Sequence, residues 1–370
     1  MRPRVVAMIC ALVVGTAGCS SARQGTGGHA LTVTASDTAC TVEKTSLPAG
    51  RHTFEVTNTG SKVTEFYVYA AGDRVVGEVE NVTPGLRRTL VVDLAAGSYQ
   101  ATCKPGMVGD GIRTALTVSG SAASRPEDAT LTAAVDGYRQ YVRGQAATLV
   151  DRTAAFVAAV KSGDAVTART LYPQARGYYE RIEPVAESFG DLDPKIDARE
   201  DDVEPGATWT GFHRLEKDLW GGVDPRADAA VADQLAADVA ALKAKVDGLT
   251  LTALQLAQGA KELLDEVASK KVTGEEDRYS HTDLWDFQAN IDGSRAAVLA
   301  LRPYLDAREA ALGPRLDQRF ARVQAELDKY RQGDGYVSYT QLTPAQVKAL
   351  SDVLNGLAEP VSQVASAVAK

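Results

Sequence analysis

The sequence predicts a multidomain β + α protein, in which an N-terminal β-sandwich is followed by an all-α helical bundle. Two observations support this prediction. Between residues 31 and 118, short segments of alternating apolar and polar residues are separated by turn residues, a pattern typical of a β-sandwich. After residue 128 alanine and leucine dominate, and apolar residues recur at helical spacing. A chain of 370 residues is long enough for both domains.

Residues 1–18 are predicted to be a signal peptide. A basic start at Met1–Arg4 precedes an apolar run that ends near Val14, and this run is too short to span a membrane. The following Thr16-Ala-Gly-Cys19 resembles the bacterial lipobox, so we expect Cys19 to be lipidated and residues 19–29 to form a tether. A plain secretory signal is the alternative, because Thr16 stands where leucine is usual.

The charge of the chain excludes one class of function. The net charge is −8, and removal of the signal peptide would take away Arg2 and Arg4 as well. Such an acidic balance argues against a nucleic-acid-binding surface and suits a protein that meets cations. We therefore expect no nucleic-acid partner, and the predicted signal peptide indicates an extracytoplasmic protein.

The β domain is expected to cover residues 30–119. The segments with strand-like alternation are 31–34, 52–57, 65–69, 88–94 and 114–118. Residues 120–128 read as a linker by composition, being rich in serine and alanine with one proline.

The remaining residues, 129–370, are expected to form antiparallel helices with short connections. Glycines, one of them followed by proline, separate most of the helical stretches. The predicted helices are 130–162, 164–189, 208–220, 226–247, 250–271, 281–311, 314–331 and 343–369.

One strand and loop of the β domain resemble the last ligand loop of cupredoxins. Gly97-Ser-Tyr99-Gln-Ala-Thr-Cys103 leads into Lys-Pro-Gly-Met107, where cupredoxins often carry a histidine and then a methionine. Here no histidine follows Cys103 in this loop, and Glu65 stands where the earlier cupredoxin histidine is expected. A blue-copper centre with two histidines and one cysteine is therefore not predicted.

Cys40 and Cys103 leave two interpretations open. In an oxidising compartment two cysteines of one small β domain usually form a structural disulfide. Alternatively Cys40, Glu65 and Cys103, with Met107 or Asp110, surround a metal ion in a mixed sulfur and oxygen site that suits copper.

The strongest functional signal is His213, one of four histidines, followed three residues later by Glu216. Residues at i and i+3 share a helix face, so imidazole and carboxylate can converge on one cation. The simpler interpretation is a hydrogen-bonded core histidine. Acidic segments at 180–202 and 275–286 favour a metal site, since two clusters on separate helices can face each other across the bundle.

Long segments resemble the imelysin family, and within it the extracytoplasmic iron-uptake proteins that carry an N-terminal cupredoxin domain. They are residues 179–193, 196–202, 211–216 and 276–290. The resemblance implies a helical bundle with a His-x-x-Glu metal motif, which maps onto His213 and Glu216. It implies further acidic ligands, for which Glu276 is the first candidate and Asp224 or Asp228 are weaker ones.

The resemblance also implies a function and partners. Such proteins bind iron as Fe(II) or Fe(III) and work with a membrane iron permease and a haem peroxidase. Zinc or copper would also fit these ligands. We expect a non-enzymatic binder. The alternatives are an imelysin-like metallopeptidase, although the chain lacks the second histidine of a His-Glu-x-x-His site, and a purely structural lipoprotein.

Overall fold

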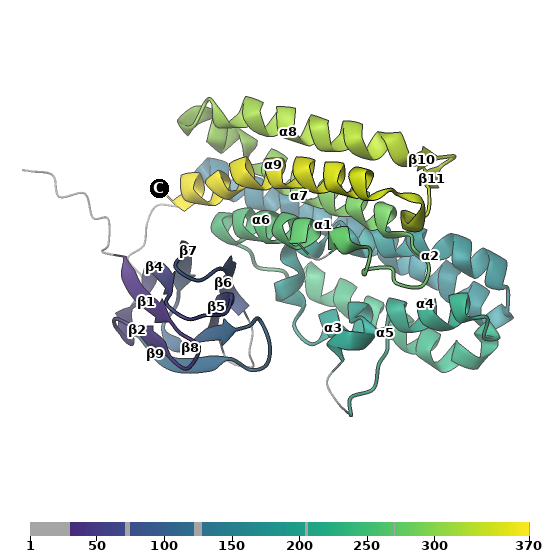
Figure 1. Ribbon diagram of the computed structural model, residues 1–370, viewed down its shortest axis with the longest axis horizontal. Coiled ribbons are helices and arrows are strands. Elements are labelled where there is room, and N and C mark those ends of the chain that lie inside the picture. Colours follow the sequence, from purple (N-terminus) through teal and green to yellow (C-terminus); the bar gives the residue numbers. More distant parts are fainter. Residues whose placement is uncertain (1–29, 71–74, 122–127, 204–205, 270, 370) are drawn as a thin grey trace, which may run out of the picture.

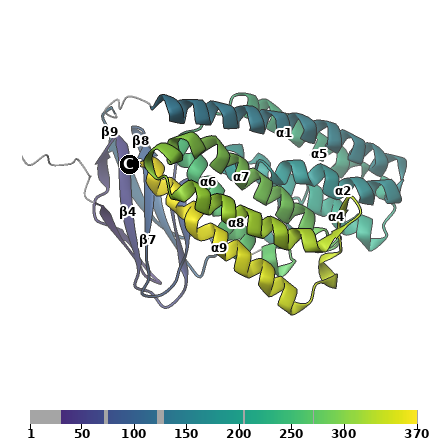
Figure 2. The same cartoon turned by 90° about the horizontal axis from the view of Figure 1, so that it is seen from above.

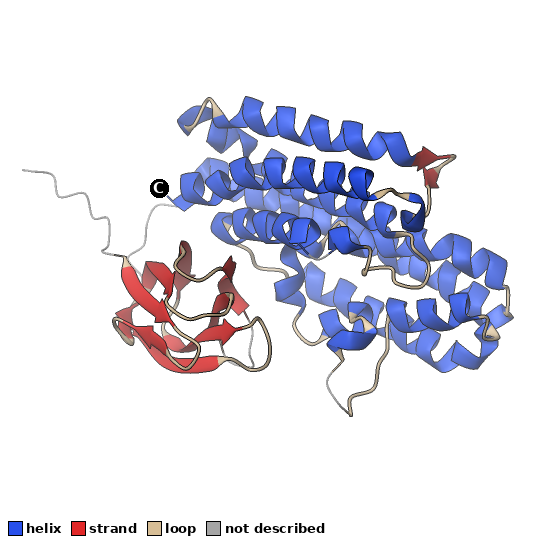
Figure 3. Cartoon of the chain, viewed as in Figure 1, coloured by secondary structure: helices blue, strands red, loops and turns tan. Residues whose placement is uncertain are grey.

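The computed structural model describes residues 30–70, 75–121, 128–203, 206–269 and 271–369, and shows a β-sandwich beside a helical bundle (Figures 1 and 3). The predicted fold class, a β-sandwich followed by an all-α helical bundle, is confirmed. The predicted signal peptide, the tether with Cys19 and most of the linker lie outside the described residues. Within the described part of the chain, no helix is both long enough and apolar enough to cross a bilayer.

The sandwich consists of a four-stranded and a five-stranded sheet that bury a shared apolar core. The first sheet has the order β2 (Cys40–Val42), β1 (Leu31–Ala35), β4 (Gly50–Asn58) and β7 (Arg87–Leu94). The second has the order β3 (Ser46–Pro48), β9 (Ile112–Ser119), β8 (Gly97–Pro105), β5 (Thr64–Tyr69) and β6 (Val75–Val82). Three of these strands were not predicted: β2 and β3 are too short to show alternation, and a glycine interrupts the pattern of β6.

A disulfide joins the two sheets. Cys40 in β2 and Cys103 in β8 are bonded, with their Cα atoms 5.4 Å apart. Both side chains are part of the apolar core between the sheets. Of the two interpretations of these cysteines, the structure therefore shows the structural disulfide.

The bundle is built from nine α-helices among the described residues, connected by turns and short 3-10 segments. The helices are α1 (Ala129–Ser162), α2 (Ala165–Glu180), α3 (Leu192–Asp197), α4 (Phe212–Gly221), α5 (Ala229–Asp247), α6 (Ala253–Ser269), α7 (Asp283–Arg308), α8 (Leu312–Leu327) and α9 (Pro344–Ala369). The 3-10 segments are η2 (Glu183–Phe189), η3 (Glu200–Asp202), η4 (Pro225–Asp228), η5 (Lys271–Thr273), η6 (Asp328–Tyr330) and η7 (Tyr339–Gln341), and a small hairpin pairs β10 (Arg331–Gln332) with β11 (Gly335–Tyr336).

The largest departure from the predicted helices lies after α2. A single helix over 164–189 was expected, but α2 ends at Glu180 and the chain continues as the 3-10 segment η2. Pro184 explains the break, because proline disfavours helical backbone in the residue before it and cannot donate an N–H to the preceding turn. The break lets the chain turn toward α3, whose last residue Asp197 belongs to the site described below.

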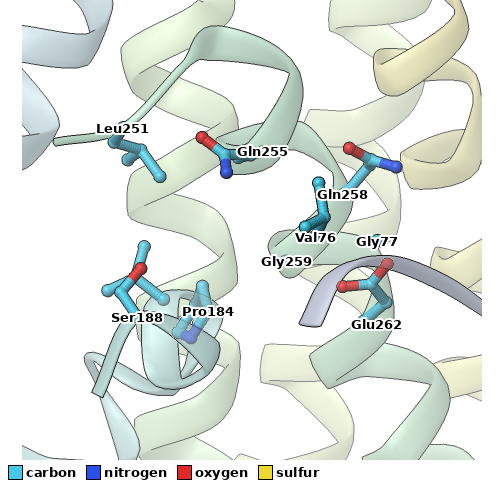
Figure 4. Close-up of a pocket in the computed structure, with 10 residues that line it drawn as sticks. Val76, Gly77, Pro184, Ser188, Leu251, Gln255, Gln258, Gly259 and Glu262 are labelled. Atoms are coloured by element: carbon cyan, nitrogen blue, oxygen red, sulfur yellow. The ribbon is translucent and has the colours of Figure 1, made fainter. Parts of the chain in front are cut away.

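The sandwich packs against one end of the bundle (Figure 2). The Gln258 side chain on α6 donates a hydrogen bond to the carbonyl of Val91 (2.9 Å), and Arg51 on β4 donates to the carbonyl of Ala369 (2.6 Å). Figure 4 shows the small hollow at this contact, where Val76 and Gly77 of β6 face η2 and α6.

Gly259 on α6 is required by the close approach of η2. A Cβ atom at this position would lie 1.8 Å from the carbonyl oxygen of Pro184. Only glycine leaves room for this contact. The same contact fixes the position of η2, which carries Glu183 toward the centre of the bundle.

We predict that a protein beginning at residue 20 exposes no reactive thiol until it is reduced. Replacing both cysteines by serine, as Cys40→Ser with Cys103→Ser, should destabilise the β domain by about 4 kcal/mol, because the disulfide closes a loop over a sequence separation of 63. Urea unfolding followed by strand signals in NMR measures this loss. The fluorescence of Trp209, Trp220 and Trp285, which all lie in the helical domain, is the internal control and should keep its midpoint. Two free thiols in unreduced, chelator-treated protein would contradict the pairing.

Candidate metal centre

The centre lies inside the bundle, where α2, α3, α4 and the segment before α7 meet. Helix α4 begins at Phe212, directly after Gly211, whose φ is 89°. A Cβ atom at Gly211 would lie 2.4 Å from the carbonyl oxygen of Ile196. Glycine is thus needed both for the left-handed backbone and for the close approach to α3. This junction places His213 beside Asp197.

His213 and Glu216 both point into the interior, with exposed fractions of 2% and 0%. Nδ1 of His213 lies 3.0 Å from Oε2 of Glu216. The other oxygen of Glu216 accepts hydrogen bonds from the backbone N–H groups of Tyr279 (3.0 Å) and Ser280 (2.7 Å). Glu216 is therefore fixed by the segment before α7, and it orients the imidazole ring.

The opposite nitrogen of the ring faces two carboxylates. Nε2 of His213 lies 3.8 Å from Oδ1 of Asp197 and 3.7 Å from Oε1 of Glu276. Nε2 makes no hydrogen bond to any described residue, although it is buried. One imidazole nitrogen and two carboxylate oxygens within 4.8 Å of one another form a donor set that suits a transition metal.

A second possible group shares His213. Nδ1 of His213 and oxygens of Glu216 and Asp277 also lie within 4.8 Å of one another. In this group Nδ1 is already engaged by Glu216, and Asp277 accepts a hydrogen bond from the hydroxyl of Tyr172 (2.9 Å). Nε2 is therefore the ring nitrogen that is free to bind an ion.

Two buried cations neutralise part of this acidic interior. Arg176 on α2 is fully buried and forms ion pairs with five carboxylates, those of Glu180, Asp197, Glu276, Asp277 and Asp286. Lys271 is 1% exposed and its ammonium bonds Glu180 (2.8 Å) and Glu183 (3.0 Å). Asn290 on α7 donates to the same two carboxylates. Pairing of this kind is required, because an isolated charge is very costly to bury.

The pKa values of the cluster diverge strongly. Burial and the nearby Arg176 lower the pKa of His213, but its contacts with Glu216, Glu276 and Asp197 outweigh them and raise the pKa to about 9. Burial raises the pKa of Asp197 to about 7, against the opposing charge of Arg176. Burial also acts on Glu276, but Lys271, His213 and Arg176 hold its pKa well below the usual range. Such divergence is typical of functional sites.

The structure corrects the expectation of a metal site in the β domain. The sulfurs of Cys40 and Cys103 are bonded to each other, so neither is a thiolate ligand. In the register of β5 and β8, Glu65 lies opposite Lys104 and Phe66 lies opposite Cys103. Because neighbouring residues of a strand point to opposite faces of the sheet, the side chains of Glu65 and Cys103 point to opposite faces. Glu65 accepts a hydrogen bond from the hydroxyl of Tyr67 (3.0 Å). Met107 lies in the turn after β8 with a positive φ of 60°.

The weaker acidic candidates are corrected too. Asp224 is exposed, caps η4 by accepting from the backbone N–H of Arg226 (3.0 Å), and pairs with the Arg226 side chain. Oδ1 of Asp228 lies 3.4 Å from Nη2 of Arg214, with which it forms an ion pair. Neither is part of the groups around His213. By contrast, the structure brings His213, Glu216 and Glu276 together.

Asp197, Asp277 and Arg176 were not selected from the sequence. The two aspartates lie in the acidic segments already noted, but nothing in the sequence distinguishes them from their exposed neighbours. Arg176 carried no signal at all, since an arginine in a helix is ordinarily a surface residue. Its burial is decided by the packing of α2 against α7.

Comparison with known proteins agrees with this architecture. The sequence model of the imelysin family matches residues 134–364, and that of a cupredoxin-like domain matches residues 8–118. The chain belongs to the imelysin family. It is similar to the "Iron uptake system component EfeO" of Yersinia pestis, with 41% identity over 90% of this chain and 89% of that protein. The EfeO proteins of Yersinia pseudotuberculosis serotype I (40%) and Escherichia coli O157:H7 (41%) cover the same shares. The predicted resemblance to iron-uptake members of this family is confirmed, and the chain is of the EfeO type.

We predict that His213 makes the stability of the metal-free protein depend on pH. Its pKa in the folded protein, about 9, is above the value of about 6.5 expected in the unfolded chain. The protonated ring therefore contributes in full below pH ~6.5, and this contribution, about 3 kcal/mol, is lost as the pH rises through ~9. Urea unfolding of the wild type and His213→Gln in chelator should show the gap between them shrinking from pH 6 to pH 10. A gap that is constant or grows with pH would contradict the assigned pKa.

Proposed function

We propose that this chain is the extracytoplasmic iron-binding component of an iron-uptake system. The observation that carries the proposal is the buried Nε2 of His213, which lacks a hydrogen-bond partner and faces Asp197 and Glu276. The printed name of its relatives, iron uptake system component, supports iron as the cargo. Hard carboxylate oxygens with one imidazole suit Fe(II) and Fe(III), and zinc would fit the same donors.

In this proposal the residues divide into ligands and a positioning residue. Nε2 of His213 with oxygens of Asp197 and Glu276 hold the ion. Glu216 fixes the ring by accepting from Nδ1–H and is itself fixed by two backbone N–H groups. Such an outer carboxylate sets the orientation and basicity of a metal-bound histidine. The proposal places no copper in the β domain, because both thiols are consumed in the disulfide.

The same proposal includes location and partners. Residues 1–18 would direct export, lipidated Cys19 would anchor the protein at the outer face of the cell membrane, and residues 19–29 would form the tether. The sandwich would occupy residues 30–119 and the bundle residues 129–370. Captured iron would pass to a membrane iron permease that works with a haem peroxidase. No nucleic acid takes part.

A metallopeptidase is the alternative function. Imelysins have been classed with peptidases, but a hydrolytic zinc site needs a positioned water and a general base beside several ligands. Glu216 is the carboxylate nearest to His213 in the sequence and would be the candidate general base. Its oxygens already accept hydrogen bonds from the His213 ring and from two backbone N–H groups. Binding without turnover is therefore the function that the geometry supports.

We predict that His213→Ala abolishes measurable binding of Fe(II) in anaerobic calorimetry, and that Asp197→Asn and Glu276→Gln each weaken it. Glu216→Gln should weaken it by about 10- to 100-fold, since an amide cannot accept all the bonds that the carboxylate accepts. Asp224→Asn is the matched control and should bind as the wild type, because Asp224 is exposed, caps η4 and pairs with the Arg226 side chain.

Wild-type affinity in His213→Ala would overturn the proposed site. Hydrolysis of a peptide library by zinc-loaded wild type, lost in His213→Ala, would favour the peptidase instead.

A further inference from the structure

The two carboxylate oxygens that face His213 are already held by a cation of the protein itself. Nη1 of Arg176 bonds Oδ1 of Asp197, and Nη2 of Arg176 lies 2.6 Å from Oε1 of Glu276. These are the same two atoms that lie nearest Nε2 of His213. A metal ion at Nε2 and the guanidinium would therefore share the same two oxygen atoms.

Arg176 cannot resolve this competition by losing its proton. A guanidinium stays charged in proteins, and the carboxylates around Arg176, Asp197 and Asp286 among them, outweigh the effect of burial and raise its pKa further. Two cations sharing both oxygens would repel each other strongly in a buried site. If a metal ion binds there, this repulsion favours movement of the Nη groups away from the ion.

The structure provides acceptors to which the guanidinium can turn. Oδ1 of Asp286 and Oδ1 of Asn290, both on α7, are buried and make no hydrogen bond to any described residue. Nε of Arg176 is already anchored to the other oxygen of Asp286 at 3.0 Å. Oε1 of Glu180 lies 2.5 Å from Nη2 and also lacks a well-aligned hydrogen bond. The two oxygens that face the metal position, Oδ1 of Asp197 and Oε1 of Glu276, are called the metal-facing oxygens below. A rotation about the anchor would move the Nη groups away from them and toward Oδ1 of Asp286 and the existing partner Glu180.

Neighbouring cations do not bridge the same pair of atoms. Lys271 lies 3.6 Å from Oε1 of Glu276 but is bonded mainly to Glu180 and Glu183. Arg199 contacts the other oxygen, Oε2, of Glu276 at 3.3 Å. Within the described part of the chain, Arg176 is the one cation paired with both metal-facing oxygens.

We propose that Arg176 is a surrogate cation that exchanges with the bound metal. This proposal rests on the proposed function. In the metal-free protein Arg176 neutralises Asp197 and Glu276 and keeps the interior folded. When the ion arrives at Nε2 of His213, the guanidinium turns toward Asp286 and Glu180. Its return competes with the ion and hastens release, which suits a protein that hands over its cargo rather than storing it.

The test compares Arg176→Gln with Arg199→Gln, a matched control that also removes a cation from Glu276 but spares the two metal-facing oxygens. Arg176→Gln should lower the melting temperature of the metal-free protein, yet bind Zn²⁺ at least about tenfold more tightly and release it to a chelator more slowly, because the competitor is gone. Arg199→Gln should stay within about threefold of the wild type. Arg176→Lys keeps the positive charge but lacks the planar guanidinium donors, so its Zn²⁺ affinity should lie between those of the other two variants.

A merely structural arginine would give a different result, since its loss would weaken both folding and binding. Weaker or unchanged Zn²⁺ affinity in folded Arg176→Gln would overturn the inference.

A second measurement uses the wild type and does not depend on the variant folding. In ¹⁵N-labelled protein, the Nε–H and Nη signals of Arg176, assigned by their loss in Arg176→Lys, should shift on saturation with Zn²⁺. Normal Zn²⁺ binding without a shift would overturn the surrogate role and leave the proposed function standing. Absence of Zn²⁺ and Fe(II) binding in calorimetry would overturn the proposed function itself.

Discussion

The helical domain is organised around one buried guanidinium. Arg176 pairs with carboxylates from its own helix α2, from α3 and from α7 with its preceding segment. Because each of these charges is out of water, none can lose its partner without a large cost. The helices that carry them are therefore held in register by electrostatics as well as by apolar packing. The candidate metal centre occupies one side of this ion-pair cluster and uses two of its carboxylates.

This arrangement explains why an acidic interior is compatible with a folded metal-free state. The cluster has more carboxylates than cations, and the excess is handled in two ways. Lys271 and Arg176 form ion pairs with several of them, and burial raises the pKa of some, Asp277 and Asp286 among them, well above the usual range. The pKa of Asp197 is raised to about 7, and that of the His213 imidazole is raised to about 9. In the proposed function, protons and the guanidinium of Arg176 would give way to a metal ion at this site.

The β domain has similar ligand types but a different organisation. Its cysteines are consumed in a disulfide that ties the two sheets, and strand alternation directs Glu65 away from them. Its contact with the bundle runs through β6 against η2 and α6, around Gly259 and Pro184 (Figure 4). Pro184 directly follows Glu183, which binds Lys271. The interface between the domains therefore lies next to the cluster in the bundle.

The two domains, their order and most helices could be predicted from the residues alone, because strand alternation, helical spacing and glycine or proline breaks are local signals. The sequence also singled out His213 and Glu216, since an i, i+3 pair on one helix is a local geometry. It could not decide whether Cys40 met a metal or Cys103, which depends on how two sheets face each other. Nor could it separate Asp197 from Asp224. Only tertiary packing buried one beside His213 and left the other in solvent, and only packing made Arg176 an interior cation rather than a surface one.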